Sequence, residues 1–370
     1  MKKWEIGSNY KDEVVMKSFM FVVPSLSKGG AERVVSVLAS GLAERGYFVT
    51  VLRYFKTESD YMVNDKVNVV TLSQTEDEYD RMSKFVLFKK MHRVFKQYKP
   101  DYIIPFLRKV NIQTAIASLG FFKKIVYTVR VSPYLDSGIY GKIHKFLINH
   151  TNKTIVQNYE QKEYYSKYAQ KRIYVLPNPV DERFLNVKRK NEDDKEFRIV
   201  SLGRLEKQKN FSMLIKAFEE FARSKENVYL DIYGEGGERE NLQVLINELA
   251  LDDIVTLKGR SNDVPAVFEK ANLYVLSSNF EGMPNALLEA MAAGLPCIST
   301  ECKTGPKEMI ENKVSGILVS VGDEEKMFEA LKFIYENKVF AAQMGRRAKN
   351  EVLNNYTIDE VLKKFLIFFN

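Results

Sequence analysis

The chain has 370 residues, 45% of them hydrophobic and 12% aromatic, so it is long enough for two domains with sizeable packed cores. No tract is rich in Gly and Ser, Gln and Asn, or Pro, which argues against a disordered or fibrous protein. Two cysteines and three histidines exclude a disulfide scaffold and argue against a zinc site, and they favour a cytoplasmic setting. No run approaches the roughly 18 apolar residues of a membrane span, and residues 1–15 form a polar leader of unknown role without the apolar core of a secretory signal.

The net charge of +8 is unevenly distributed. Residues 1–180 contain 29 basic and 16 acidic residues, a net charge of +13, whereas residues 181–370 contain 27 and 32, a net charge of −5. A basic half indicates an anionic partner, which the composition leaves open as nucleic acid, a phosphate-bearing substrate or an anionic membrane surface.

Strands and helices alternate along the first half. Buried strands are predicted at 18–25, 47–54, 67–72, 102–106, 125–129, 154–156 and 173–176, with helices at 31–46 and 84–98 and helical stretches between the later strands. This series ends at the turn Pro177-Asn178-Pro179, and the polar segment 186–196 suits a linker.

The alternation then restarts. Strands are predicted at 197–202, 228–233, 254–257, 273–276, 296–299 and 315–319, and helices at 211–224, 238–250, 263–270, 285–293, 323–336, 339–353 and 357–368. Such alternation implies an α/β protein with parallel sheets covered on both faces. We therefore expect two doubly wound, Rossmann-like domains facing a central cleft, with ligands at the carboxyl ends of the strands.

Three motifs suit a phosphorylated sugar ligand. Gly29 and Gly30 follow the first strand and open a helix, where backbone N–H groups can bind an anion; the plain alternative is a tight turn that needs a positive φ. Gly203 and Arg204 end the first strand of the second half, and Lys209 follows, a cation pair suited to a diphosphate unless both side chains are simply solvated.

The third motif is the segment 281–289, EGMPNALLE. Asn285 is expected to cap a helix there, and the carboxylates of Glu281 and Glu289 can accept hydrogen bonds from sugar hydroxyls. The alternative is a helix cap with an exposed carboxylate. Arg130 follows the strand at 125–129 and is expected to face the cleft, although a surface arginine is an equal alternative.

Residues 84–99, KFVLFKKMHRVFKQYK, mix apolar and basic side chains, as do residues 121–124. Such a segment can lie on an anionic membrane. The alternative is a core-packed helix with a solvated basic face. The charge of the whole half favours membrane contact.

Together these motifs resemble family 4 of the retaining glycosyltransferases, which have the GT-B fold. The similar segments are SKGGAERVVSVLASGLAERG (27–46), LPNPVD (176–181), SLGRLEKQKNFSMLIKAF (201–218), YGEGGERENL (233–242), LKGRSNDV (257–264), SSNFEGMPNALLEAMAAGLPCIST (277–300) and GPKEMIENKVSGILV (305–319). Many family members carry a histidine where this chain has Arg130.

The resemblance implies a role for each matching residue. Arg204 and Lys209 would neutralise the donor's diphosphate, Glu281 would contact the donor sugar, and Glu289 would bind the ribose hydroxyls. Arg130 would lie near the reacting centre. The remaining donor-binding residues implied are Gly29, Gly30, Gly203, Arg260, Gly282, Met283, Pro284, Asn285, Ala286 and Leu287.

The implied domains are 1–180 for the acceptor, 181–356 for the nucleotide-sugar, and a last helix, 357–370, that crosses back to the first domain. The implied reaction moves a sugar, most simply from a UDP-sugar, to an acceptor hydroxyl in polysaccharide, lipopolysaccharide or lipid-linked glycan synthesis. No cofactor or metal is expected, and the expected partners are a glycan or polyprenyl-diphosphate-linked acceptor and the inner face of the plasma membrane.

Three alternatives stay open. A nucleotide-sugar epimerase of the same fold would need no acceptor, and a non-catalytic partner subunit would keep the fold for assembly. A nucleic-acid-binding protein would explain the basic half, but we expect no nucleic acid, because no known binding motif organises these charges.

Overall fold

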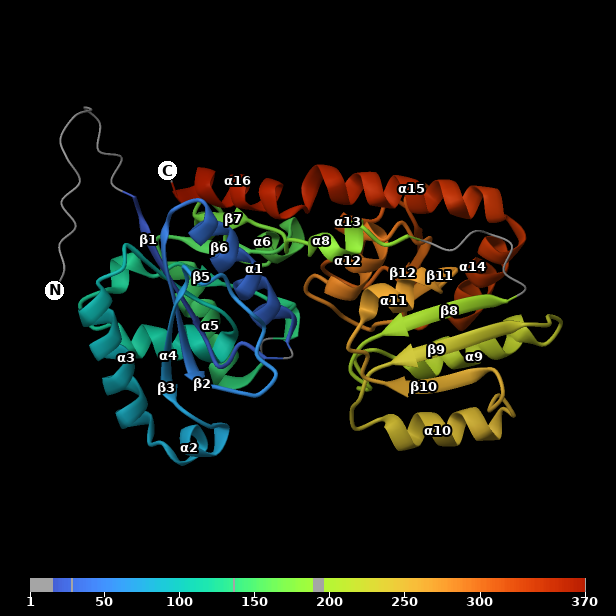
Figure 1. Ribbon diagram of the computed structural model, residues 1–370, viewed down its shortest axis with the longest axis horizontal. Helices are drawn as coiled ribbons and strands as arrows, with labels where there is room; N and C mark the ends of the chain where they lie inside the picture. Colours follow the sequence, from blue (N-terminus) through green and yellow to red (C-terminus); the bar gives the residue numbers. More distant parts are fainter. Residues whose placement is uncertain (1–15, 28, 136, 189–195, 370) are drawn as a thin grey trace.

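The computed structural model describes residues 16–27, 29–135, 137–188 and 196–369 (Figure 1). The leader predicted at 1–15 and most of the linker predicted at 186–196 lie outside these residues. The chain forms two α/β lobes side by side, joined along one edge by the last two helices.

The first lobe is built on parallel strands. The order β3-β2-β1-β4 forms one ladder and β5-β6-β7 a second. The N–H group of Val126 donates to the carbonyl oxygen of Ile103 at 2.9 Å, which links β4 to the segment before β5. The strands are β1 (Ser18–Val23), β2 (Phe48–Phe55), β3 (Asn68–Ser73), β4 (Tyr102–Pro105), β5 (Tyr127–Thr128), β6 (Thr154–Val156) and β7 (Ile173–Val175).

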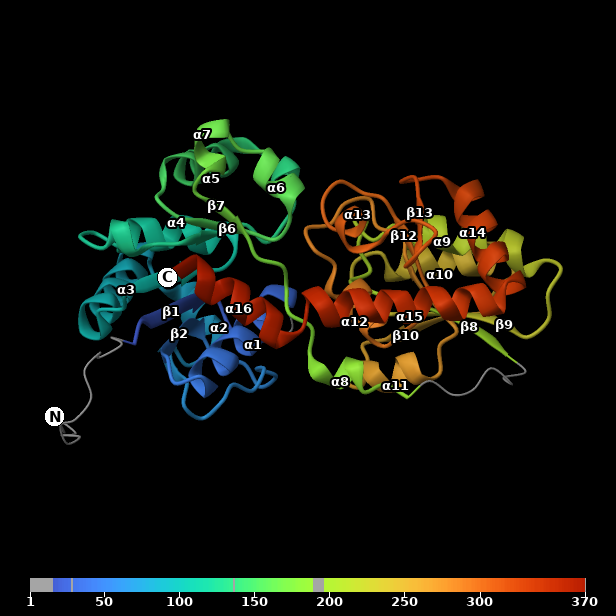
Figure 2. The same cartoon turned by 90° about the horizontal axis from the view of Figure 1, so that it is seen from above.

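Helices cover both faces of this lobe (Figure 2). One face carries α1, and α4 and α5 lie on the other side, with α6 and α7 beyond them. These helices, with two short 3₁₀ turns, are α1 (Gly30–Glu44), α2 (Glu76–Arg81), α3 (Lys84–Tyr98), α4 (Arg108–Ala117), η1 (Phe122–Lys124), η2 (Pro133–Leu135), α5 (Gly138–His150), α6 (Tyr159–Glu163) and α7 (Lys167–Gln170).

The second lobe has one six-stranded parallel sheet in the order β10-β9-β8-β11-β12-β13, the doubly wound order of a Rossmann domain. Its strands are β8 (Phe197–Leu202), β9 (Val228–Tyr233), β10 (Val255–Gly259), β11 (Leu273–Leu276), β12 (Cys297–Thr300) and β13 (Ile317–Val319). Its helices are α8 (Glu182–Leu185), α9 (Phe211–Ala222), α10 (Arg239–Glu248), α11 (Val264–Glu269), α12 (Asn285–Ala292), α13 (Pro306–Met309), α14 (Glu324–Glu336) and α15 (Lys338–Asn355).

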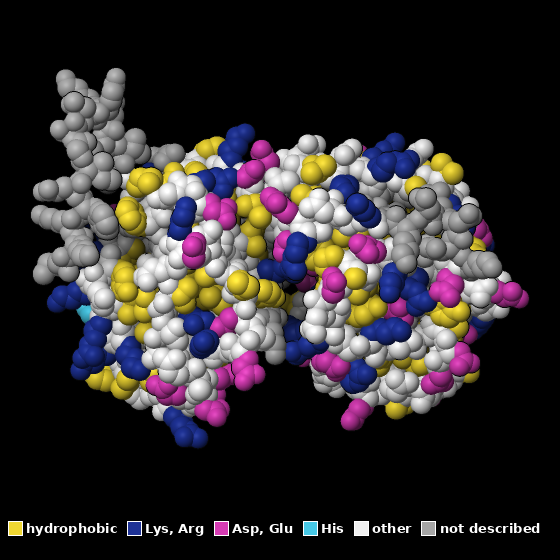
Figure 3. Space-filling model, viewed as in Figure 1, with side chains coloured by type: hydrophobic (Ala, Val, Ile, Leu, Met, Phe, Trp, Pro, Cys, Tyr) yellow, Lys and Arg dark blue, Asp and Glu magenta, His cyan; other side chains and the backbone are white. Residues whose placement is uncertain are grey.

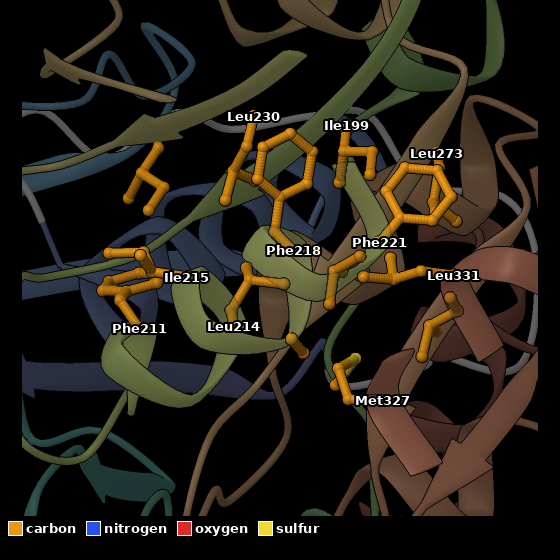
Figure 4. Packing of buried hydrophobic residues seen from close by; sticks show 14 of the residues in the cluster. Ile199, Phe211, Leu214, Ile215, Phe218, Phe221, Leu230, Leu273, Met327 and Leu331 are labelled. Carbon is orange, nitrogen blue, oxygen red and sulfur yellow. The ribbon is translucent and has the colours of Figure 1, made fainter. Parts of the chain in front are cut away.

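Apolar periodicity explains how α9 packs. Phe211, Leu214, Phe218 and Phe221 recur at helical spacing and are buried against the sheet residues Ile199, Leu230 and Leu273, and α14 adds Met327 and Leu331 (Figure 4). This core holds the ends of β8 and β11 in place, and the loops that follow them carry Lys209 and Glu281.

The last helix, α16 (Ile358–Phe369), belongs to the core of the first lobe. Phe365 and Phe369 pack on Phe19 of β1, and their ring centroids lie 5.3 and 5.1 Å, respectively, from that of Phe19. Because α15 packs on α12 in the second lobe, the α15–α16 segment ties the two lobes together (Figures 1 and 2).

The long elements agree with the sequence prediction to within a few residues. The predicted strand at 125–129 keeps only Tyr127 and Thr128 in its ladder. In α3 the apolar residues Met91 and Phe95 are fully buried in the core of the first lobe. The apolar face of this helix therefore packs on the core, as in the core-packed alternative.

Candidate functional site

The N-termini of α1 and α12 meet at the seam between the lobes. A Cβ atom built on Gly30 would lie 2.7 Å from Nδ2 of Asn285, so a side chain there would displace the Asn285 amide. Gly29 has a φ of −108°, and neither glycine has a positive φ, so the tight-turn alternative is wrong. Two positive helix ends therefore face one region, an arrangement suited to an anion.

The predicted cap at Asn285 is wrong. Pro284 occupies the N-cap position of α12, and Asn285 is the first helical residue. The Asn285 side chain is used between the lobes instead: its Oδ1 accepts from Nδ2 of Asn178 at 2.7 Å, and its Nδ2 donates to the carbonyl oxygen of Gly30 at 3.2 Å.

Glu289 lies one turn into α12 and is buried at the seam. Its Oε1 lies 2.6 Å from Nη1 of Arg33, which projects from the first turn of α1 and also lies over the Phe184 ring. Burial raises the pKa of Glu289 to about 7, and the nearby Arg33 charge opposes this rise. A carboxylate that half-titrates near neutrality is poised to exchange its arginine partner for other hydrogen-bond donors.

Glu281 and Lys209 form a second pair, within the second lobe. Nζ of Lys209 lies 2.6 Å from Oε1 of Glu281, and Oγ of Ser278 donates to the same oxygen at 2.7 Å. The side chains are 15% and 9% exposed, so the pair is largely shielded from solvent. The stem of Lys209 lies against Gly203, where a Cβ atom would come within 2.7 Å of it.

Arg130 comes from the end of the β5 segment and is not a surface arginine. Its Nη1 donates to Oδ1 of Asn178 at 3.1 Å, and its guanidinium lies over the Phe106 ring, 4.3 Å from the centroid. The Nε and Nη2 atoms are buried without a hydrogen-bond partner, and burial lowers the pKa of Arg130 to about 9. A charged group with unused donors at the seam is suited to an anionic or hydroxyl-bearing ligand.

Gly282 packs directly on the first lobe. A Cβ atom there would lie 2.9 Å from the carbonyl oxygen of Arg130, and the Gly282 carbonyl accepts from Nδ2 of Asn158 at 2.8 Å. Met283 is buried next to it, and its Sδ accepts from the Asn178 N–H group. The loop before α12 is thus held in place by the first lobe.

The other predicted residues lie on the second lobe alone. Arg204 and Arg260 are exposed in the loops after β8 and β10, and Ala286 and Leu287 belong to the first turn of α12. The structure therefore gathers Gly30, Arg130, Gly282, Asn285 and Glu289 at the seam. Arg204 and Arg260 stay at the loop rim, and among the described residues neither makes a side-chain hydrogen bond or ion pair with that group.

Sequence reasoning missed Arg33 and Asn178. Arg33 lies 256 positions from Glu289, so no spacing rule could pair them. The signal for Asn178 was present in the Pro-Asn-Pro turn, which predicted a bend but not the hydrogen bonds to Arg130 and Asn285 that its amide makes.

A further interdomain contact joins α6 to the second lobe. The carboxylate of Glu308 accepts from the N–H groups of Tyr159 and Glu160 at 3.0 Å each. In return, the carboxylate of Glu160 accepts from the N–H group of Thr304 at 2.6 Å. Figure 3 shows the lobes meeting along a hollowed seam with Lys and Arg side chains beside it.

Within the described ranges, no group of three or more His, Cys, Asp and Glu side chains is placed to hold a metal ion. None of the helices described has the length and apolar character that a membrane crossing needs.

Comparisons with known proteins cover nearly the whole chain. The family model described as Glycosyl transferases group 1 matches residues 182–351, and that described as Glycosyltransferase Family 4 matches residues 28–184. An uncharacterized glycosyltransferase of Haemophilus influenzae is 27% identical over 95% of this chain and 99% of its own length.

Two more similar proteins have named ligands or substrates. A Campylobacter jejuni protein named GalNAc-alpha-(1->4)-GalNAc-alpha-(1->3)-diNAcBac-PP-undecaprenol alpha-1,4-N-acetyl-D-galactosaminyltransferase is 27% identical over 95% of this chain and 98% of its own length. The solved structure of Anabaena HepE in complex with UDP-glucose matches with a TM-score of 0.78 at 18% identity, covering 95% of this chain and 99% of that one.

Proposed function

The chain belongs to family 4 of the glycosyltransferases and has the GT-B fold, and on that premise we propose that it transfers a hexose or N-acetylhexosamine from a UDP-sugar to a lipid-linked glycan. The observation that carries this proposal is the meeting of the α1 and α12 N-termini beside the Lys209–Glu281 pair and the Arg33–Glu289 pair. Positive helix ends suit a diphosphate, and carboxylates suit sugar hydroxyls.

We assign donor binding to the second lobe, 181–356, and acceptor binding to the first lobe, 1–180, with the terminal helix 357–370 bracing both. Glu289 binds the ribose hydroxyls after exchanging Arg33 for them. Lys209, with Arg204 brought from the loop rim, neutralises the diphosphate as the bond to the sugar breaks. Glu281 contacts the donor sugar, and Lys209 holds its carboxylate in position.

Arg130 is assigned to the reacting centre. Its two unpaired donors are buried, and an unsatisfied buried donor costs about 1–3 kcal/mol. A ligand oxygen that accepts from Nε or Nη2 recovers that free energy. This accounts for an arginine whose guanidinium, within the described part of the chain, donates to a single side-chain oxygen, Oδ1 of Asn178.

The transfer is proposed to proceed without a metal, because two helix ends and the cations neutralise the diphosphate. Activity that survives excess chelator supports this; activity that is lost and then restored by Mg²⁺ or Mn²⁺ contradicts it. The acceptor is proposed to be polyprenyl-diphosphate-linked, as the name of the similar Campylobacter protein suggests. The enzyme is proposed to work in the cytoplasm, bound peripherally to the inner face of the plasma membrane.

Thermal unfolding with UDP, GDP and ADP tests the donor assignment. A nucleotide at about 100 times its dissociation constant adds roughly 2.7 kcal/mol to the free energy of unfolding, a shift of several degrees. We expect a shift with UDP that Lys209→Met weakens and that Lys207→Met, an exposed neighbour, leaves intact. A shift with GDP or ADP alone contradicts the UDP assignment. Release of UDP-sugar isomers without any acceptor would favour the epimerase alternative.

A further inference from the structure

Helix α5 has a buried face and an unpartnered apolar face. Gly141, His144 and Ile148 point into the first lobe. Ile139, Ile143 and Phe146 are spaced by four and three residues, so they form one stripe on the opposite face, with exposed fractions of 65%, 37% and 60%.

The α5 stripe lies in a segment of the chain that is rich in exposed apolar side chains. Of the 24 exposed large hydrophobic residues among those described, ten lie between residues 116 and 146, a segment of only 31 residues. They include Tyr140 of α5, Tyr134 and Leu135 of η2, and Phe122 of η1. A concentration of this kind marks an interaction surface rather than the scattered exposure of an ordinary monomer.

The positive charge of this region indicates that its partner is anionic. Residues 102–159 contain eight Lys and Arg residues and a single acidic residue. Lys142 and Lys145 are exposed on α5 itself. Apolar and aromatic side chains interleaved with lysines match the interface of an anionic bilayer, where the apolar groups enter the acyl region and the ammonium groups meet lipid phosphates.

The geometry points to the exposed face of α5, with η2, as the surface that docks the protein on an anionic bilayer; Tyr134 of η2 and Lys145 of α5 both contact the Tyr164 ring. This inference deepens the proposed function, on which it rests, and it moves the contact from the predicted helix at 84–99 to α5. In α3, Met91 and Phe95 are buried, whereas Ile139, Ile143 and Phe146 of the α5 stripe are exposed.

The α5 surface adjoins the candidate site. The chain runs from Arg130 through η2 into α5, and the ring of Tyr134 lies under Nζ of Lys303 from the second lobe, 4.7 Å from the centroid. An acceptor held in the bilayer by its lipid would therefore present its head group at the seam, near the unpaired donors of Arg130.

Flotation with vesicles tests the surface. The full chain is mixed at low salt with phosphatidylglycerol–phosphatidylcholine vesicles or with phosphatidylcholine alone, and we expect binding to the first only. Each lysine lost costs about fivefold in affinity. Lys142→Glu with Ile143→Ser should therefore lower vesicle binding at least tenfold. The matched pair on α3, Lys84→Glu with Phe85→Ser, is also exposed but lies outside the proposed surface, so it should leave vesicle binding within twofold.

The UDP-induced thermal shift separates this inference from the proposed function. A Lys142→Glu/Ile143→Ser variant that keeps the UDP shift and its melting temperature but loses vesicle binding supports the inference. Binding lost in the α3 variant instead, equal binding to neutral vesicles, or no binding by the full chain overturns it. A concentration-dependent dimer that the α5 substitutions abolish would assign the face to a second copy and also overturn it. If UDP does not raise the melting temperature of the unmodified chain, the proposed function is refuted, whereas the vesicle-binding result still stands by itself.

Discussion

The pH dependence of donor binding reports directly on Glu289. The charged carboxylate offers two strong acceptor oxygens to the ribose hydroxyls, whereas the neutral acid keeps only one, and the pKa of Glu289 is about 7. The charged fraction falls from about nine-tenths at pH 8 to about one-tenth at pH 6, so donor affinity should fall about ninefold over that range. A UDP-sugar is the proper ligand, because its phosphates, unlike the terminal phosphate of UDP, do not titrate there.

Arg33→Met moves this titration. Arg33 holds Glu289 through a charge-assisted hydrogen bond of 2.6 Å, worth about 1.5–3 kcal/mol, and 1.36 kcal/mol corresponds to one pKa unit. Losing it should raise the midpoint of the affinity curve by about one to two pH units. Affinity at pH 7 should then fall roughly 5- to 50-fold.

Isothermal titration calorimetry between pH 6 and 9 measures both curves. Glu289→Gln cannot titrate, so its affinity should be low and independent of pH. Arg45→Met is the matched control, because Arg45 lies at the other end of α1 and pairs with Asp359 of α16, away from the seam. An unmoved midpoint in Arg33→Met would refute the reasoning, and a higher affinity would show that Arg33 blocks the ribose site.

Three other substitutions probe the site and its stability. Lys209→Met should lower kcat about 10²–10³-fold in a sugar-transfer assay, as expected for one preorganised charge at a leaving group; an unchanged kcat would remove Lys209 from the reaction. Gly282→Ala should force the lobes apart, since its Cβ would lie 2.9 Å from the backbone of Arg130, and transfer activity should be lost. Gly237→Ala is the control: the space around its Cβ is open, so transfer activity should not change. Folded Glu289 keeps its proton up to about pH 7 and the unfolded chain releases it near 4.5, so the free energy of unfolding should fall by about 3 kcal/mol as pH rises between these values. Denaturant titrations of Glu289→Gln should lack that fall.

The local pattern of the chain carried most of the fold. Alternating apolar strands and helices at 3.6-residue spacing predicted the long strands of both lobes to within a few residues, because β8, β9 and α9 each have a periodic apolar pattern of their own. The short elements α2 and α13 were not predicted, since four to six residues carry too little periodicity. The prediction of a cap at Asn285 was wrong because an asparagine at the start of a helix can either cap that helix or bind a neighbouring segment.

By itself, the sequence determined the α/β class, the two repeats of alternating elements, and the loops that carry Lys209, Glu281 and Glu289, because each depends on residues close together in the chain. Only the tertiary structure decided how those side chains are paired. Arg33 meets Glu289 across 256 positions, Asn178 joins Arg130 to Asn285, and α3 rather than α5 is the helix whose apolar face is buried. The physical reason is that a pattern shows which face of an element is apolar, whereas the partner of that face is decided by how the elements pack within and between the lobes.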